Sequence, residues 1–142
     1  MFDIKSFYEA SSVEDAIRAL SADPDSLVIS GGTDVLIRVR EGRDAGKSLV
    51  SIHNIPELKG VTMKENGDIV IGPATSFSHI TNHEIIKKHL NMLGEAVDQV
   101  GGPQVRNTAT IGGNVCNGAT SADSASTLCT LYRAGPDGEA AE

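Results

Sequence analysis

The apolar residues of this chain recur at two spacings, one typical of helices and one typical of strands. One helical face consists of Val13, Ala16, Ile17 and Leu20. It overlaps the segment Ser11-Ser12-Val13-Glu14, in which a serine precedes a glutamate by three positions, as in a capping box. The pattern therefore predicts a helix that begins at this segment and ends at Asp23-Pro24-Asp25.

Short runs rich in apolar residues predict strands at 27–29, 49–52, 61–63 and 69–71. The first run is followed by Ser30-Gly31-Gly32-Thr33-Asp34 and then by helical spacing at residues 35–39. This order predicts a strand, a glycine turn and a helix. Because the last two runs flank an Asn-Gly dipeptide at 66–67, we expect them to form a hairpin, so that parallel and antiparallel pairing both occur.

The second half of the chain begins with further helical spacing. Thr75 or Ser76 is placed to cap a helix, and apolar residues repeat at helical spacing from Met92 to Val100. We expect Gly101-Gly102-Pro103 to end the last of these helices.

The composition changes after this point. Residues 101–130 contain only two charged residues, Arg106 and Asp123, among five Gly, eight Ser or Thr and three Asn. Such composition is typical of a linker. The interspersed apolar side chains favour instead a folded loop system that exposes backbone N–H groups, which bind anions.

Composition and charge exclude several classes of protein. The formal net charge is −7 and the basic residues are scattered, which argues against a nucleic-acid partner. No apolar run exceeds three residues, so the sequence offers neither a membrane span nor a signal-peptide core, and we expect a cytoplasmic location. Two cysteines cannot hold an iron–sulfur cluster or a four-thiolate zinc site by themselves.

Two Gly-Gly pairs are the main candidates for a binding site: Gly31-Gly32 after the strand at 27–29, and Gly112-Gly113 in the uncharged stretch. Glycine backbone can approach a ligand closely, and N–H groups at a following helix start favour a phosphate. A single pair of this kind more often forms a simple tight turn, whereas for the two pairs together a tight turn and a binding site are about equally expected. Neither pair matches the P-loop or the dinucleotide-binding glycine pattern, so ordinary nucleotide-binding folds are disfavoured.

Three polar residues near these pairs have candidate roles. We interpret Thr33 and Asp34 as helix-capping residues. Asp123 could accept hydrogen bonds from sugar hydroxyls or could cap a helix.

The sequence gives little support for a metal site, a reactive cysteine or a hydrolase nucleophile. His79 and His83 have the spacing of two metal ligands on a helix but lack a third ligand, so surface histidines are favoured and no metal site is predicted. Cys116 is interpreted as a small buried thiol. No serine has the context of a hydrolase nucleophile, and no catalytic residue is assigned.

Three motifs together resemble a known family: Leu27 to Leu36 around the first pair, Gln104 to Asn114 around the second, and Asn117 to Ser124. The sequence resembles the FAD-binding subunit of xanthine dehydrogenase and related molybdenum hydroxylases. The resemblance extends to about Leu131, and it implies an α+β FAD-binding domain over residues 1–142, with small mixed sheets and flanking helices.

The resemblance also implies the cofactor, FAD, and its contacts. The diphosphate would lie between the two glycine turns, and Asp123 would contact the sugar-like part. The residues that carry this expectation are Leu27, Val28, Ile29, Ser30, Gly31, Gly32, Thr33, Asp34, Ala109, Thr110, Ile111, Gly112, Gly113, Asn114 and Asp123. The two glycine pairs provide two separate stretches of main chain that could bind phosphate. A diphosphate that spans both suits them better than a single phosphate, so FAD is favoured over FMN.

In such enzymes a molybdenum centre oxidises the substrate, iron–sulfur clusters relay electrons, and FAD passes a hydride to NAD⁺. The resemblance therefore implies a molybdenum-cofactor subunit and an iron–sulfur subunit as partners, NAD as electron acceptor, and a purine such as xanthine as substrate. An oxidase with covalently attached FAD would need a His or Cys in the first glycine turn, which has neither.

Members of this family continue into a second, strand-rich part. We therefore expect residues 1–142 to be an amino-terminal portion that binds FAD weakly by itself. The alternative is a truncated, non-catalytic remnant that keeps the fold and some affinity for the diphosphate.

Overall fold

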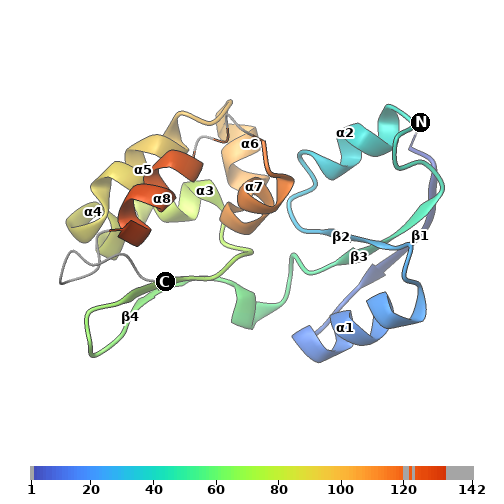
Figure 1. The fold of residues 1–142 in the computed structure, drawn as a ribbon, viewed down its shortest axis with the longest axis horizontal. Coiled ribbons are helices and arrows are strands. Elements are labelled where there is room, and N and C mark those ends of the chain that lie inside the picture. The colour runs from blue at the N-terminus through green and yellow to red at the C-terminus, as the bar shows by residue number, and fades with distance from the viewer. Residues whose placement is uncertain (1, 120–121, 123, 134–142) are drawn as a thin grey trace.

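A parallel three-stranded sheet forms the first part of the fold. The computed structural model describes residues 2–119, 122 and 124–133. Strands β1 (Ile4–Glu9), β2 (Leu27–Ile29) and β3 (Lys47–Ser51) pair in the order β1-β3-β2. Because β3 lies in the middle, it is buried from Ser48 to Ser51. The sheet has α1 (Val13–Ala22) on one side and α2 (Val35–Arg40) on the other (Figure 1).

The carboxyl ends of β2 and β3 lie at the same edge of this sheet. Their register pairs Ile29 with Ser51, and the next residue, Ile52, donates its N–H to Ile29 O at 2.9 Å. The strand, glycine turn and helix predicted at 27–39 are confirmed, as is the strand predicted at 49–52, which begins two residues earlier and ends one residue earlier. The glycine turn therefore leaves the sheet at the edge where parallel sheets most often bind ligands.

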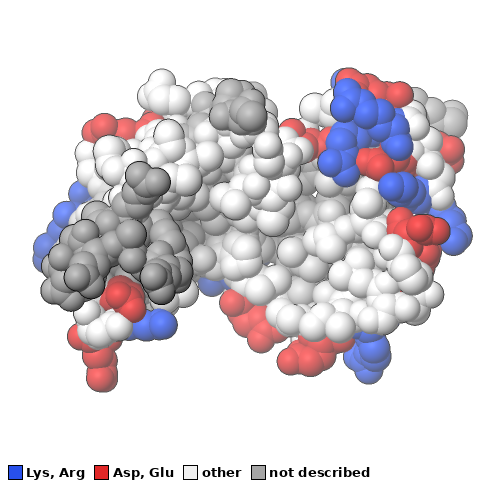
Figure 2. Space-filling view, viewed as in Figure 1, with Lys and Arg blue, Asp and Glu red and all other residues white. Residues whose placement is uncertain are grey.

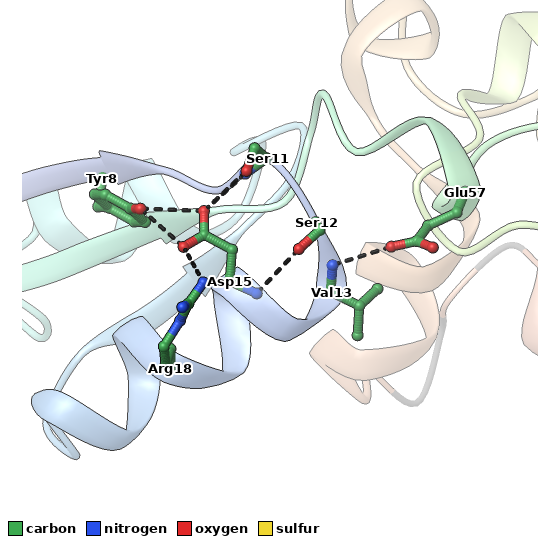
Figure 3. Close-up of polar contacts among 7 residues, drawn as sticks. All are labelled: Tyr8, Ser11, Ser12, Val13, Asp15, Arg18 and Glu57. Atoms are coloured by element: carbon green, nitrogen blue, oxygen red, sulfur yellow. Dashed lines mark hydrogen bonds and ion pairs between the residues drawn. The ribbon is translucent and has the colours of Figure 1, made fainter.

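The first helix begins one residue later than the capping box predicted. Ser12 is the N-cap, and its hydroxyl accepts the N–H of Asp15 rather than that of Glu14. The Asp15 carboxylate accepts from the N–H of Ser11 and from the Tyr8 hydroxyl (Figure 3). These hydrogen bonds, that of Ser11 first, lower the pKa of Asp15, and the same carboxylate raises the pKa of Tyr8.

The predicted hairpin is confirmed. After a short 3-10 helix, η1 (Pro56–Leu58), strands β4 (Val61–Met63) and β5 (Ile69–Ile71) pair antiparallel. Gly67 in the turn has φ +91°, a conformation that side chains rarely adopt.

The remaining described residues form helices. These are α3 (Phe77–Asn82), α4 (Glu84–His89), α5 (Asn91–Asp98), α6 (Pro103–Thr108), α7 (Ile111–Asn117) and α8 (Ala125–Arg133). Ser76 caps α3, as predicted, by accepting the N–H of His79. The helices pack around a core that includes Phe77, Ile80, Ile86, Leu93 and Val97, all fully buried.

Two sequence-based expectations are wrong in this half. The uncharged stretch is largely helical and not a system of loops, because α7 is hydrogen-bonded to the chain before α3 and α6 packs against α3. Pro103 begins α6 at its first turn, where proline needs no N–H partner, while α5 has already ended at Asp98.

No helix among the described ranges is long and apolar enough to cross a membrane. Figure 2 shows Lys and Arg interleaved with Asp and Glu around α2, whereas the surface over α6 and α7 is largely uncharged in this view. The charged residues near α2 are partly paired with one another: Arg38 and Lys47 both contact Asp44.

Candidate cofactor site

The first glycine turn presents unused main-chain donors. It runs from Ser30 to Asp34, between β2 and α2. The N–H groups of residues 31–34 donate to no acceptor in the described part of the chain. Gly32 has φ +76°, which lets the turn reverse direction and lets Gly32 O accept the N–H of Leu36 at 3.0 Å. Consecutive N–H groups of this kind form a concave anion-binding backbone.

Two side chains of the first glycine turn, those of Asp34 and Ser30, make no hydrogen bond that caps α2 or ties the turn to the described residues. Asp34 is the N-cap of α2 by position, but it has helical backbone angles and its side chain makes no capping hydrogen bond. The N-cap position expected for Asp34 is therefore confirmed, but its side chain does not supply the cap. Ser30 Oγ is buried and has no hydrogen-bond partner among the described residues.

The second glycine segment is fixed along the chain that precedes α3. Ala109 O accepts the N–H of Phe77 at 3.1 Å, and Ile111 donates to Thr75 O at 3.1 Å. Ser76 and Thr110 pair as an isolated antiparallel bridge between these two contacts. Ala109 and Ile111 are buried in the helical core, so their side chains face the protein interior and only main chain is left to line a site.

The glycines of the second pair have separate roles. Gly112 donates its N–H to Pro73 O at 2.9 Å, and a methyl group on its Cα would lie 2.7 Å from that same oxygen. This N–H is therefore already used, and glycine is required here by close packing against Pro73. Gly113 is exposed and donates its N–H to the Thr110 hydroxyl, which caps α7. Their contact with the cofactor stays a prediction.

The two segments meet at Gly31. A methyl group on the Gly31 Cα would lie 1.9 Å from Thr108 O and 3.2 Å from the Ala109 Cα. Only glycine permits this approach, because any side chain would overlap the carbonyl group. The fold thus places the first glycine turn directly against the start of the second segment, and Figure 1 shows the turn between β2 and α2 beside α7.

A shallow pocket of about 260 Å³ opens beside the first turn. Its lining comprises Phe2, Gly31, Gly32, Thr33, Leu36, Ile37 and Arg40. Arg40, at the end of α2, is a cationic residue that lines the same pocket as the first glycine turn. It was not singled out in the sequence, where nothing distinguishes it from Arg38 and Arg43.

Other predicted residues are placed as follows. Leu27, Val28 and Ile29 form β2, and of these Ile29 is buried beneath the glycine turn. The Asn114 side chain accepts the hydroxyl of the buried Ser124 at 2.5 Å, which links α7 to the start of α8. Asp123 lies outside the described residues.

His79 lies on α3, His83 directly follows this helix, and Cys116 lies on α7. His79 and His83 stack with ring centres 5.4 Å apart, and α3 ends between them at Asn82. No group of three or more potential metal ligands occurs among the residues that the structure describes. Cys116 is exposed, so its interpretation as a buried thiol is wrong.

Comparison with known proteins assigns the chain to a family. Residues 2–132 match the family described as the FAD binding domain in molybdopterin dehydrogenase. The chain is 46% identical over 125 residues to the xanthine dehydrogenase FAD-binding subunit of Escherichia coli O157:H7, covering 88% of this chain and 43% of that protein. It is 34% identical to the nicotinate dehydrogenase FAD-subunit of Eubacterium barkeri, again covering 88% of this chain and 43% of the relative.

The fold agrees with this assignment. The carbon monoxide dehydrogenase of Hydrogenophaga pseudoflava contains a chain that superposes with a TM-score of 0.78 at 29% identity, covering 83% of this chain and 41% of that one. The chain thus spans less than half the length of the relatives it matches. The α+β fold class, the family and the cofactor expected from the resemblance are confirmed. The chain belongs to the family of FAD-binding domains of molybdopterin dehydrogenases, and its cofactor is FAD.

Proposed function

We propose that this chain supplies the FAD-binding part of a xanthine dehydrogenase-like molybdenum hydroxylase. The observation that carries the proposal is the contact between Gly31 and Thr108, which joins the two glycine-bearing segments beside a row of unused N–H groups. When bound, FAD would accept electrons from iron–sulfur clusters and reduce NAD⁺. The unpartnered Ser30 hydroxyl and the N–H groups of residues 31–34 fit an anionic group of the size of its diphosphate.

The chain's own residues then bind and orient the cofactor. The N–H groups of residues 31–34 donate to the phosphate oxygens, and the Arg40 guanidinium adds positive charge at the rim of the pocket. The main chain from Thr110 to Gly113 forms the opposite wall, held in place by its hydrogen bonds to residues 73–77. Asp123 contacts a sugar hydroxyl in this proposal.

The relatives are named as a FAD-binding subunit and as a medium chain of larger dehydrogenases. In this proposal an iron–sulfur subunit and a molybdenum-cofactor subunit supply the electrons, since the two cysteines of residues 1–142 cannot hold an iron–sulfur cluster. The xanthine dehydrogenase relative favours a purine such as xanthine as the substrate of the complex. The predicted cytoplasmic location belongs to the same proposal.

The test is to purify the complete flavin subunit with its partner subunits and extract the flavin with acid. We expect FAD, and we expect xanthine-dependent reduction of NAD⁺ by the complex. Recovery of FMN alone would contradict the proposed cofactor site. Bound FAD without electron transfer to any acceptor would favour the non-catalytic remnant.

A further inference from the structure

The chain forms two parts with separate apolar cores. The first part, residues 2–58, holds the parallel sheet, α1, α2 and η1, and its core surrounds the fully buried Ile55. The second part, the described residues of 61–133, holds the hairpin and the remaining helices, with the fully buried Phe77 in its core. The two cores share no residue among those described. Each part therefore contains the apolar packing that holds it together.

Direct packing between the two parts is sparse. The pairs of described helices and strands that pack extensively against each other all belong to the same part. Across the boundary, Gly31 approaches Thr108 O so closely that no side chain fits between them. Figure 1 shows the sheet with α1 and α2 on one side and the helices α3–α8 on the other, with the chain passing between them after β3. Parts of one chain that lack a large apolar interface are expected to move relative to each other.

The segment that connects the two parts changes its anchorage at Leu58, the last residue of η1. On the first part, the Glu57 carboxylate accepts the N–H of Val13 at 3.0 Å (Figure 3), and the Leu58 side chain packs against the core. On the second part, Leu58 O accepts the N–H of Ala74 at 2.8 Å. A single residue thus joins two anchored segments. Hinges have this form, because a few residues at the ends of elements absorb the change in backbone angles.

A ligand at the first glycine turn meets both parts. The unused N–H groups of residues 31–34 belong to the first part, whereas the main chain of residues 110–113, the opposite wall of the proposed site, belongs to the second. Rotation at Leu58 changes how these two segments face each other, because they lie in different parts. A ligand that contacts both segments binds best to the arrangement that brings them together, and it therefore favours that arrangement.

We propose that the two parts move as separate bodies about Leu58, and that the diphosphate of FAD closes them onto each other. The inference rests on the proposed function, because the ligand is the one assigned to the glycine turns. Without ligand, the contact between Gly31 and Thr108 forms and breaks. With the diphosphate bound, the parts stay in the closed arrangement of the structure, in which this contact is made.

The test measures distances between two spin labels by pulsed electron spin resonance on the full chain, with the exposed Cys116 and Cys129 replaced by serine. One label pair, on Ile17→Cys in α1 and Met92→Cys in α5, spans the two parts. The matched control pair, on Met63→Cys in β4 and Met92→Cys, lies within the second part. The three labelled positions are exposed, so the labels do not disturb either core.

Without ligand, the pair that spans the parts should give a broader distance distribution than the control pair. Saturating ADP, whose binding is verified by calorimetry, should narrow this distribution and leave that of the control pair unchanged. A distribution across the parts that is as narrow as the control without ADP would overturn the inference and leave the proposed function intact. A broad distribution that bound ADP does not narrow would do the same. Absence of ADP binding in the calorimeter would contradict the proposed function and, with it, closure by the diphosphate.

Discussion

At Gly31, the structure requires a residue without a side chain. Gly31→Ala would place a methyl group 1.9 Å from Thr108 O, and this backbone carbonyl cannot move without disturbing α6. We expect a loss of at least about 3 kcal/mol in unfolding free energy, the upper end for overpacking, measured by urea denaturation. We also expect weaker FAD binding, because the two glycine segments must separate.

Gly102→Ala is the matched control for this substitution. Gly102 has an extended backbone, and a methyl group there would approach only the flexible Gln104 side chain, at 3.2 Å. Its stability should stay close to that of the parent. Equal losses at both glycines would mean that the contact with Thr108 is not the reason for glycine at position 31.

Asp44 makes the stability of the chain depend on pH. The hydrogen bond from Lys47, and then that from Arg38, lower the pKa of Asp44 in the folded state. A carboxylate with a lowered folded pKa stabilises the fold above the pKa of its unfolded form, about 3.9, and this stabilisation is lost as the pH falls through the folded value. Asp15 and Asp23 have lowered pKa values as well and contribute with the same sign.

Asp44→Asn should therefore lower the thermal midpoint at pH 7 and reduce the further decrease between pH 5 and pH 2. A series of melting curves across this range measures both effects. Asp25→Asn, at an exposed turn position, should leave the midpoint at pH 7 unchanged. If Asp44→Asn were as stable as the parent at pH 7 and equally sensitive to acid, the ion pairs of Asp44 with Lys47 and Arg38 would not stabilise the fold.

Among the elements, those with local sequence signals were predictable. The strand, glycine turn and helix at 27–40 and the hairpin around Gly67 follow from apolar runs and turn residues. Strand β1 was missed because its residues are mostly exposed and show no apolar alternation; pairing with the distant β3 creates it. Helices α6 and α7 were missed because glycine, asparagine and threonine are weak helix formers, so packing decides their structure.

The candidate site could likewise be predicted from the sequence only in part. The glycine pairs and their motifs identify the two segments, because glycine and resemblance are both visible in the sequence. Their contact through Gly31 and Thr108, and the attachment of Gly112 to Pro73, depend on residues far apart in the chain. The side-chain environments of Asp34 and Cys116 likewise depend on packing that the sequence pattern does not reveal.

Helix α7 depends on the close packing of Gly112 against Pro73. Gly112→Ala should lower the thermal midpoint in the absence of any ligand, because the new methyl group would lie 2.7 Å from Pro73 and would push α7 away from the chain before α3. Gly113→Ala, with only the Thr110 hydroxyl nearby at 3.0 Å, should cost less. Equal midpoints for Gly112→Ala and the parent would show that α7 does not need this close contact.

Across the whole molecule, the parallel sheet with α1 and α2 and the group of helices α3–α8 meet where the two glycine segments touch (Figure 1). A ligand bound at this place contacts both parts of the fold. Binding of FAD should therefore raise the thermal midpoint of the full chain more than binding of FMN, which lacks the diphosphate. Equal stabilisation by the two flavins would indicate that the diphosphate does not reach the junction.

In the proposed site, the main-chain N–H groups of residues 31–34 bind the diphosphate of FAD. The most direct measurement is a titration of the ¹⁵N-labelled chain with FAD and with ADP, followed by amide chemical shifts. We expect both ligands to shift the amides of residues 31–34 most strongly among those of the sheet part. FAD binding that leaves these amides unchanged would contradict the proposed diphosphate site.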